Sequence, residues 1–366
     1  MKKREILKII KALASERAPS GLENNRGKIF KTQMEKIMAS DFKIQRDQLG
    51  NYYTKLKGSS SGKKIAIIAH IDEIGGTIRK VRPDGTLEFS KRGGYEGRWL
   101  ISKTVQILNK DRKWVNGVIC GRSTHSTPEK LRGKENIDPL DLRVYIGAQN
   151  RDDVIEKYRL HIGAPFVFSG DFGLLNPKID DDVIAGYSMD NLAALTCLIV
   201  LTEKLVSNLK NQRGSLNLSG NVYIVASTRE EIGTEGAFYF TRNHSIDKVI
   251  AIDIGIVEDA SGTIHSALEL HGGPVIVWQE SRGHGILDYN FCRELVDTAE
   301  NNDLIYQNGV FEFYGSDAGK TQKWLGLPSA LIGIPTKFSH NVPEVSTLSG
   351  IEDAAQLIYY YLQSQK

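Results

Sequence analysis

The stretch of residues 222–236 constrains the fold more than any other part of the chain. Residues 222–226 are all apolar or aromatic, which predicts a buried strand. A polar loop follows with two adjacent glutamates, Glu230 and Glu231, and then glycines and a new helix. α/β proteins hold ligands and catalytic groups at strand ends of this kind, and two neighbouring carboxylates can divide the binding of a cation and the transfer of a proton. Taken alone, a Glu-Glu pair is more often a pair of solvated loop residues.

A second buried strand is predicted within residues 64–75. Its five apolar residues indicate burial on both faces, as in a parallel sheet, and it ends on His70 with Asp72 two positions later. The two-residue period of a strand puts both side chains on the same side, so His70 could bind a metal while Asp72 orients its other ring nitrogen. A lone histidine at a strand end is more often structural, but the aspartate at this spacing makes the two interpretations equally good.

Three more polar residues stand at comparable positions. Asp190 directly precedes an apolar helix, where it fits an N-cap and a metal ligand equally well. Residues 248–253 form another buried strand that ends on Asp253. His340 comes shortly after residues 328–335, which we expect to be the last strand of the sheet.

Together these positions predict one metal site. Strand ends on one edge of a parallel sheet converge in space, so side chains far apart in sequence meet there. Two histidines and three carboxylates, one of them bridging, suit a pair of divalent first-row metals with a water between them. Glu230 is then left as the base. One site explains all five positions better than five separate structural roles; they are His70, Asp190, Glu231, Asp253 and His340.

The overall pattern is that of an α/β protein, with a mixed, largely parallel sheet sandwiched by helices. Between residues 77 and 162 the rhythm of helices and strands stops, and short strands at 104–108, 114–119 and 142–146 alternate with turns. We therefore expect a catalytic domain of residues 1–76 and 163–366, with a small inserted β-barrel domain of residues 77–162. For His125, in the longest loop of that insert, a surface or interface role is favoured over catalysis.

Composition excludes several classes of function. The formal net charge is only +3, and basic residues are scattered among acidic ones, which disfavours binding to nucleic acid or to a membrane surface. Three distant cysteines without a CxxC spacing predict reduced thiols. The N-terminus lacks the apolar segment of a signal peptide, and no apolar run approaches the roughly 20 residues of a transmembrane helix. The expected location is cytoplasmic.

The motifs in this order carry a family resemblance. The chain closely resembles the M42 metallo-aminopeptidases, the family of glutamyl, leucyl and tetrahedral aminopeptidases. Residues 142–148 fit the inserted dimerisation domain of that family. The other matching segments are residues 69–75, 230–233, 251–253, 314–318 and 334–340.

The resemblance implies two divalent metal ions per subunit, which could be zinc, cobalt or manganese. It implies that Asp190 bridges the two metals. His70 and Asp253 would complete one metal site, and Glu231 and His340 the other. One metal would polarise the scissile carbonyl, and the other could hold the free α-amine of the substrate, which implies an exopeptidase acting on the N-terminal residue of peptides.

The resemblance also implies the catalytic residues and the assembly. Glu230 would take a proton from the bridging water and pass it to the leaving amine, and Asp72 would orient His70. A homo-oligomer is expected, built from dimers that assemble to a dodecamer. In one respect the sequence departs from the family, where the bridging aspartate usually stands in an Asp-Asp-Arg context. Here Asn191 follows Asp190, which could change the local geometry or a contact with the substrate.

Two rival functions remain. A related di-zinc carboxypeptidase or amidohydrolase would use the same metals on another substrate, although the β-rich insert after the His-x-Asp strand favours an M42 enzyme. An endoglucanase-type glycoside hydrolase would need two carboxylates flanking a groove lined with aromatic side chains. Aromatic residues are only 8% of the chain and do not cluster around the carboxylates, which disfavours that function.

Overall fold

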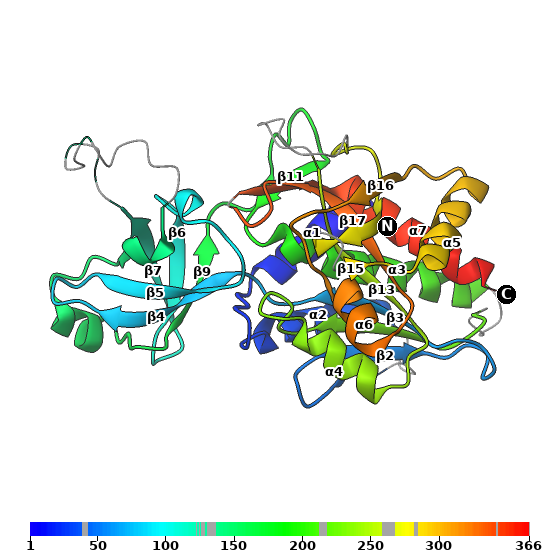
Figure 1. Cartoon of the computed structure of the whole chain (residues 1–366), viewed down its shortest axis with the longest axis horizontal. Helices are drawn as coiled ribbons and strands as arrows, with labels where there is room; N and C mark the ends of the chain where they lie inside the picture. The colour runs from blue at the N-terminus through cyan, green and yellow to red at the C-terminus, as the bar shows by residue number, and fades with distance from the viewer. Residues whose placement is uncertain are drawn as a thin grey trace.

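The computed structural model shows a helix-covered sheet with a separate barrel beside it (Figure 1). None of the helices it describes has both the length and the apolar character that crossing a membrane requires. The residues described are 1–38, 43–121, 123, 125, 129, 137–211, 218–257, 268–281, 285–341 and 343–365.

The larger part contains a twelve-stranded sheet. Its strands are β1 (Gln45–Arg46), β2 (Tyr52–Leu56), β3 (Ile65–His70), β10 (Gly173–Leu174), β11 (Val183–Gly186), β12 (Val222–Ser227), β13 (Lys248–Ile256), β14 (Val275–Glu280), β15 (Gly285–Ile286), β16 (Gln307–Val310), β17 (Ser329–Lys337) and β18 (Glu344–Thr347). The order across the sheet is β1-β2-β12-β3-β13-β17-β18-β11-β10, and β14 pairs with β17, β15 and β16. The four central strands β12, β3, β13 and β17 all run parallel, so their carboxyl ends share one edge.

Helices cover both faces of this sheet. On one face α3 packs against α7, α1 and α2, and α5 packs against α7; α4 and α6 pack together on the other. The helices are α1 (Lys3–Ala14), α2 (Asn24–Ile37), α3 (Met189–Asn211), α4 (Glu235–Asn243), α5 (Tyr289–Asn301), α6 (Asp317–Leu325) and α7 (Leu348–Ser364). The strand β3 shows why both faces are apolar: Ile65, Ile67 and Ala69 enter the core beneath α3, whereas Ala66 and Ile68 join the core beneath α4.

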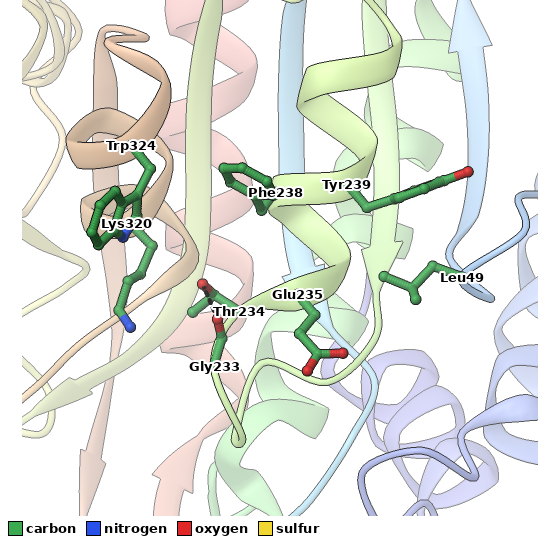
Figure 2. Close-up of a pocket in the computed structure, with 8 residues that line it drawn as sticks. All are labelled: Leu49, Gly233, Thr234, Glu235, Phe238, Tyr239, Lys320 and Trp324. Atoms are coloured by element: carbon green, nitrogen blue, oxygen red, sulfur yellow. Dashed lines mark hydrogen bonds between the residues drawn. The ribbon is translucent and has the colours of Figure 1, made fainter.

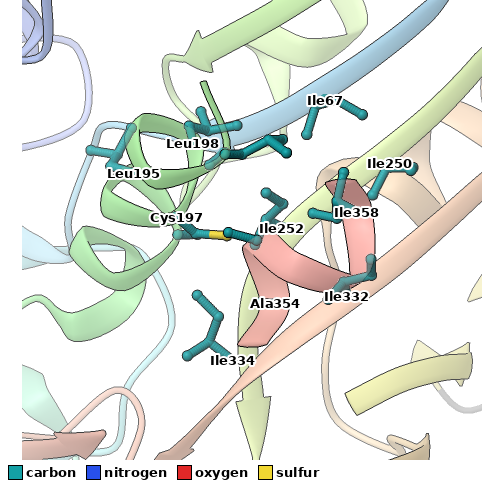
Figure 3. Packing of buried hydrophobic residues seen from close by; sticks show 14 of the residues in the cluster. Ile67, Leu195, Cys197, Leu198, Ile250, Ile252, Ile332, Ile334, Ala354 and Ile358 are labelled. Carbon is teal, nitrogen blue, oxygen red and sulfur yellow. The ribbon is translucent and has the colours of Figure 1, made fainter. Parts of the chain in front are cut away.

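The core between α3, α7 and the sheet fixes the central strands. Leu195, Cys197 and Leu198 of α3 face isoleucines of β3, β13 and β17, with Ile358 of α7 beside them (Figure 3). These side chains are fully buried or nearly so. Because interiors are packed as densely as organic crystals, this core holds the strands in fixed positions and hence the side chains at their ends.

The smaller part is a closed barrel with its own apolar core. Its strands are β4 (Gly75–Val81), β5 (Leu87–Arg92), β6 (Thr104–Leu108), β7 (Trp114–Cys120), β8 (Arg143–Tyr145) and β9 (Pro165–Ser169). They close in the order β4-β5-β8-β7-β6-β9. Gly75 is required because the backbone of Phe166 in β9 lies where a Cβ would stand.

The predicted α/β class with an inserted barrel is confirmed. The strand expected at 104–108 has those bounds. The expectation that residues 328–335 form the last strand is wrong, because the short strand β18 follows and pairs with β17. The strand expected to end on Asp253 also continues to Ile256, since β13 stays paired with β17 over its whole length. The barrel strands lie between Gly75 and Ser169, and the domain limits at residues 77 and 162 stay a prediction.

A buried acid lies between β14 and α6. Glu280 is 2% exposed, and its carboxylate accepts hydrogen bonds from the backbone N–H of Ser316 (3.1 Å) and from the Ser316 hydroxyl (2.7 Å). Gly285 and Gly319 make room for it, because a Cβ at either position would collide with the Glu280 side chain. Burial, opposed by these hydrogen bonds, raises the pKa of Glu280 to about 7.

The core predicts a large cost for truncating Leu198. Leu198→Ala is expected to lower the free energy of unfolding by about 2–5 kcal/mol, because the side chain is fully buried and leaves a cavity. Leu175→Ala is the matched control: this side chain is 55% exposed, so a change of no more than about 0.5 kcal/mol is expected. Denaturant titration measures both, and equal effects would contradict this account of the core.

Glu280 predicts a loss of stability as the pH rises. The folded chain holds the proton up to about pH 7 and the unfolded chain only to about 4.5, so the stabilisation is complete below 4.5 and is lost as the pH rises through 7. Raising the pH from 5 to 8 is therefore expected to cost the wild-type chain up to about 3 kcal/mol more than Glu280→Gln. Melting curves at each pH test this, with exposed Glu269→Gln as control. Parallel pH profiles for wild type and Glu280→Gln would refute it.

Candidate metal centre

Parallel strand ends bring the candidate residues to one edge of the sheet. His70 is the last residue of β3 and pairs in register with Ser227, the last residue of β12, so the loop that holds Glu230 and Glu231 starts beside it. His340 lies three residues beyond the end of β17, in a turn where it adopts a left-handed backbone conformation. All five predicted metal ligands thus leave from elements that converge at this edge.

The five side chains form two groups that share one member. His70, Asp190 and Asp253 make the first group and Asp190, Glu231 and His340 the second, with the donor atoms of each group within 4.8 Å of one another. Oδ1 of Asp190 lies 3.0 Å from Nε2 of His70, and Oδ2 lies 3.3 Å from Nε2 of His340. The two oxygens of Asp190 therefore face opposite halves of the site, as a bridging carboxylate must.

The remaining carboxylate of each group, Asp253 in the first and Glu231 in the second, lies slightly farther from the histidine of its group than Asp190 does. Oδ1 of Asp253 is 3.8 Å from Nε2 of His70, and Oε2 of Glu231 is 3.6 Å from Nε2 of His340. The other oxygen of Glu231 is buried without any hydrogen-bond partner. A buried carboxylate oxygen without a partner is costly, and a cation in the second group would satisfy it.

The backbone around Asp190 is not an ordinary helix start. Asp190 and Asn191 have non-helical dihedral angles and are joined by a cis peptide bond. Asn191 makes the capping contact instead, since its side-chain oxygen accepts from Ala194 N–H (3.3 Å). Its amide nitrogen donates to the carbonyl of Ile252 (3.1 Å), next to Asp253. Asn191 is only 1% exposed, and these two hydrogen bonds tie its side chain to the backbone on either side of the site.

Asp72 is tied to both sides of the site. Nδ1 of His70 lies 3.1 Å from the backbone carbonyl of Asp72 and 3.5 Å from its carboxylate. The same carboxylate accepts from the backbone N–H groups of Glu230 (3.0 Å) and Glu231 (3.2 Å) and from the hydroxyl of Ser20 (2.7 Å). Burial opposes ionisation, but the hydrogen bonds from His70 and Ser20 lower the pKa of Asp72. The residue therefore positions the glutamate pair as well as the histidine.

Burial and like charges act together on the glutamates. Burial raises the pKa of Glu230 well above its usual value, and the charges of Asp317, Asp253 and Glu231 add to the effect. Burial, together with the charges of Asp190 and Asp72, raises the pKa of Glu231 to about 8. Such carboxylates, crowded in a dry site, favour either protons or cations as partners.

The histidines respond in the opposite sense. Burial alone would lower the pKa of His340, but the charge of Glu231 and the hydrogen bond to Asp190 raise it to about 10. Burial would also lower the pKa of His70, but the hydrogen bonds to Asp190 and Asp72 raise it well above its usual value. The donor set of two imidazoles and three carboxylates fits a pair of first-row divalent cations, and no observation on these residues speaks against that fit.

Sequence reasoning missed two acids that support the site. Glu344 lies in strand β18, which the sequence did not predict. It accepts hydrogen bonds from the backbone N–H groups of Asp190 (3.2 Å) and His340 (2.9 Å), so it positions one candidate carboxylate ligand and one candidate imidazole ligand. Asp317 is the first residue of α6, and Ser316 caps that helix. Asp317 instead accepts from the Ser227 hydroxyl (2.8 Å) and keeps one buried oxygen unpaired.

A buried ion pair also went unnoticed in the sequence. Arg26 of α2 is fully buried, with one nitrogen 2.7 Å from the carboxylate of Glu73. It donates to the carbonyl of Ile71 (2.9 Å) and to the hydroxyl of Ser188 (3.2 Å). Arg26 thus ties the segment that carries Asp72 to the segment before Asp190. The sequence did not indicate that Arg26 is buried, because an arginine in a helix is normally exposed to solvent.

Two hollows border this edge of the sheet. A cavity of about 670 Å³ reaches Glu231 and is lined by Arg92, Arg229 and glycines of the barrel. A more apolar hollow of about 510 Å³ lies at α4 and α6, where Phe238 points toward Trp324 and Lys320 and Tyr239 extends toward Leu49 (Figure 2). The second hollow contains none of the candidate metal ligands, whereas the first reaches Glu231. His125 is exposed and lines neither of these two hollows.

Comparison with known proteins agrees with this geometry. The family model of the M42 glutamyl aminopeptidases matches residues 50–357. A protein of Acetivibrio thermocellus to which an aminopeptidase activity is ascribed is 28% identical over 340 residues, which are 92% of this chain and 93% of its own length.

Solved structures show the same fold. An aminopeptidase from the archaeon Desulfurococcus kamchatkensis superposes with a TM-score of 0.87 and 27% identity, covering 99% of this chain and 95% of its own. The TET1 peptidase of Pyrococcus horikoshii, which can assemble into a tetrahedron or a large octahedral shell, superposes with a TM-score of 0.82 and 24% identity over 98% of this chain and 99% of its own. The resemblance seen in the motifs is therefore confirmed, and the chain belongs to the M42 family of aminopeptidases.

Proposed function

We propose that this chain removes the N-terminal residue from peptides, with two divalent cations held by the two groups of ligands and with Glu230 as the base. Asp190 belongs to both groups, His70 and Asp253 complete the first, and Glu231 and His340 the second. The observation that carries the proposal is the position of Asp190, whose two oxygens face the two histidines at 3.0 and 3.3 Å.

The residues divide the chemistry among them. When bound, the cations supply Lewis-acid polarisation of the scissile carbonyl and lower the pKa of a water to roughly 7. Glu230, whose pKa burial raises well above its usual value, takes a proton from the attacking water and passes it to the leaving amine. Asp72 holds the backbone of Glu230 and orients His70.

Specificity for the N-terminus would follow from metal ligation. When bound, one of the two cations could hold the free α-amine of the substrate, and an acylated nitrogen would lack the lone pair for that contact. Zinc, cobalt and manganese all suit this mixture of imidazole and carboxylate donors.

We further propose a homo-oligomer built from dimers through the barrel and reaching a dodecamer. The support is the assembly of the TET1 peptidase, which shares the fold over nearly the whole chain. Large exposed apolar side chains such as Phe313 (79%) and Trp324 (65%) are consistent with surfaces that are covered in an assembly.

Metal content tests the shared ligand. The wild-type chain is expected to hold about two ions, Asp253→Ala about one, and Asp190→Ala almost none, because only Asp190 serves both groups. Elemental analysis after dialysis measures this, with the exposed Asp171→Ala as control. A full complement of metal in Asp190→Ala would refute the bridging role.

Peptides with free and acetylated N-termini test the reaction. Stepwise release of N-terminal residues is expected from the free peptides, with loss on acetylation and on chelation. Equal cleavage of acetylated peptides would favour the amidohydrolase over the aminopeptidase.

The base is tested separately. Glu230→Gln is expected to lower kcat about 10²- to 10⁴-fold while metal content stays unchanged, since it removes the proton acceptor and no ligand. Glu235→Gln, five residues farther on at the start of α4 and exposed, is the control and is expected to retain activity. A Glu230→Gln variant with wild-type kcat would exclude this residue as the base.

A further inference from the structure

The cavity at the candidate metal centre continues into a second one. The cavity that reaches Glu231 has Gly21 and Arg229 in its wall, and both residues also line a cavity of about 510 Å³ farther out. The outer cavity lies between the barrel, which contributes Trp114, and the segment that follows α1. The two form one continuous cleft leading away from the metal ligands.

This cleft is strongly cationic. Among the residues that the structure describes, two acids line it, Glu23 and Glu231. The chain as a whole is nearly balanced, with 47 basic and 44 acidic residues, so the excess of positive charge is local. The six basic side chains that line the cleft are Arg17, Arg46, Lys91, Arg92, Arg112 and Arg229.

The charges of most of these side chains are not neutralised. Within the part of the chain that the structure describes, Arg229 is the one of the six with an acid partner, exposed Glu235 at 2.9 Å. Arg92 donates to the carbonyl of Ser20 and to the hydroxyl of Thr77, both at 2.8 Å. These neutral partners fix the position of the guanidinium and leave its charge available.

Arg17, Arg46 and Arg112 also lack an acid partner among the described residues. Arg17 donates to the side chain of Gln106 (2.8 Å) and stacks on the ring of Tyr187 at 4.0 Å. Arg46 stands over the ring of Tyr52 and is exposed. Arg112 is exposed in the turn between β6 and β7, so the barrel itself adds a charge to the cleft.

The two acids in the wall are already engaged. Glu23 is buried and accepts from the backbone N–H groups of Gly21 (2.6 Å) and Arg229 (3.2 Å). Glu231 belongs to the candidate metal centre. The charge of Glu23 also acts on Arg92 and Arg229, so outside the candidate metal centre one carboxylate stands against six basic side chains.

The direction of a bound peptide follows from the proposed function, on which this inference rests. If the free α-amine of the first residue is held at the carboxylate-rich centre, only the part beyond the scissile bond can extend along the cleft. Guanidinium groups bind carboxylates with two parallel hydrogen bonds. We propose that the cleft binds the carboxylates of a peptide downstream of its first residue, so that short acidic peptides are the preferred substrates.

Matched hexapeptides test the preference. They share an N-terminal leucine and carry either two aspartates or two asparagines at the third and fourth positions, each with a free or an amidated C-terminus. The aspartate peptides are expected to have about a fivefold higher kcat/KM, mainly through KM, because each exposed ion pair contributes only a few-fold. The advantage should shrink in 0.5 M salt. A loss on amidation would assign part of the effect to the C-terminal carboxylate.

A double variant links the preference to the cleft. In Arg46→Gln/Arg112→Gln the ratio of kcat/KM between aspartate and asparagine peptides is expected to fall toward one. Lys113→Gln removes a neighbouring exposed charge outside the cleft and is the matched control, expected to keep the wild-type ratio. Equal rates for the two wild-type peptides, or a preference that survives the double variant, would overturn the proposal.

Binding separates this inference from the catalytic proposal. Fluorescence anisotropy of the labelled hexapeptides on metal-loaded Glu230→Gln requires no turnover. The aspartate peptide is expected to bind about fivefold more tightly than the asparagine peptide, and the added substitutions at Arg46 and Arg112 should abolish the difference. Equal affinities would refute the anion-binding cleft even if peptides are cleaved. Unequal affinities without any cleavage by the wild-type chain would refute only the aminopeptidase mechanism.

Discussion

The carboxylate of Asp72 is the interaction on which the candidate site depends. It lies in the segment after β3, yet it accepts hydrogen bonds from Ser20 in the turn after α1 and from the backbone of Glu230 and Glu231 after β12. Three segments that are far apart in sequence therefore meet at one buried anion. Without it, two buried N–H groups would have no acceptor, at a cost of about 1–3 kcal/mol each. The loop that carries the proposed base would then lose its fixed position.

Around that anion, the structure separates satisfied charges from unsatisfied ones. Arg26 and Glu73 form a buried ion pair, and the other N–H groups of Arg26 donate to backbone and hydroxyl oxygens. The two carboxylate oxygens of Glu344 each accept a hydrogen bond from a backbone N–H group. At the centre, by contrast, Glu231 keeps an oxygen without a partner. The periphery is held by hydrogen bonds that the protein supplies itself. The centre is left for a ligand of opposite charge, which is how a preorganised metal site differs from a structural ion-pair network.

Much of this arrangement could be predicted from the sequence, and the exceptions have physical reasons. His70, Glu231 and His340 follow long apolar strands, and a strand buried on both faces is conspicuous in a sequence. Glu344 escaped notice because β18 has four residues and no apolar run, so its pairing with β17 and β11 is a tertiary effect. Arg26 escaped notice because an arginine on a helix is normally solvated, and only the packed neighbours reveal that its charge is compensated. Assignment of the five metal ligands and of Glu230 still rests on the experiments rather than on pattern.

The connection between sheet and barrel has a mechanical consequence. β3 and β4 are joined by residues 71–74 alone, all of them buried, and this linker carries both Asp72 and Glu73. Arg26 grips it at Ile71 and Glu73, and Glu73 also receives the backbone N–H of Ala18. These hydrogen bonds fix the linker through which the barrel is attached to β3. Of the two connections between barrel and sheet, this one leads directly to the carboxylate that holds the glutamate pair, so a torque applied to the barrel by a neighbouring subunit would act on that carboxylate through four buried residues.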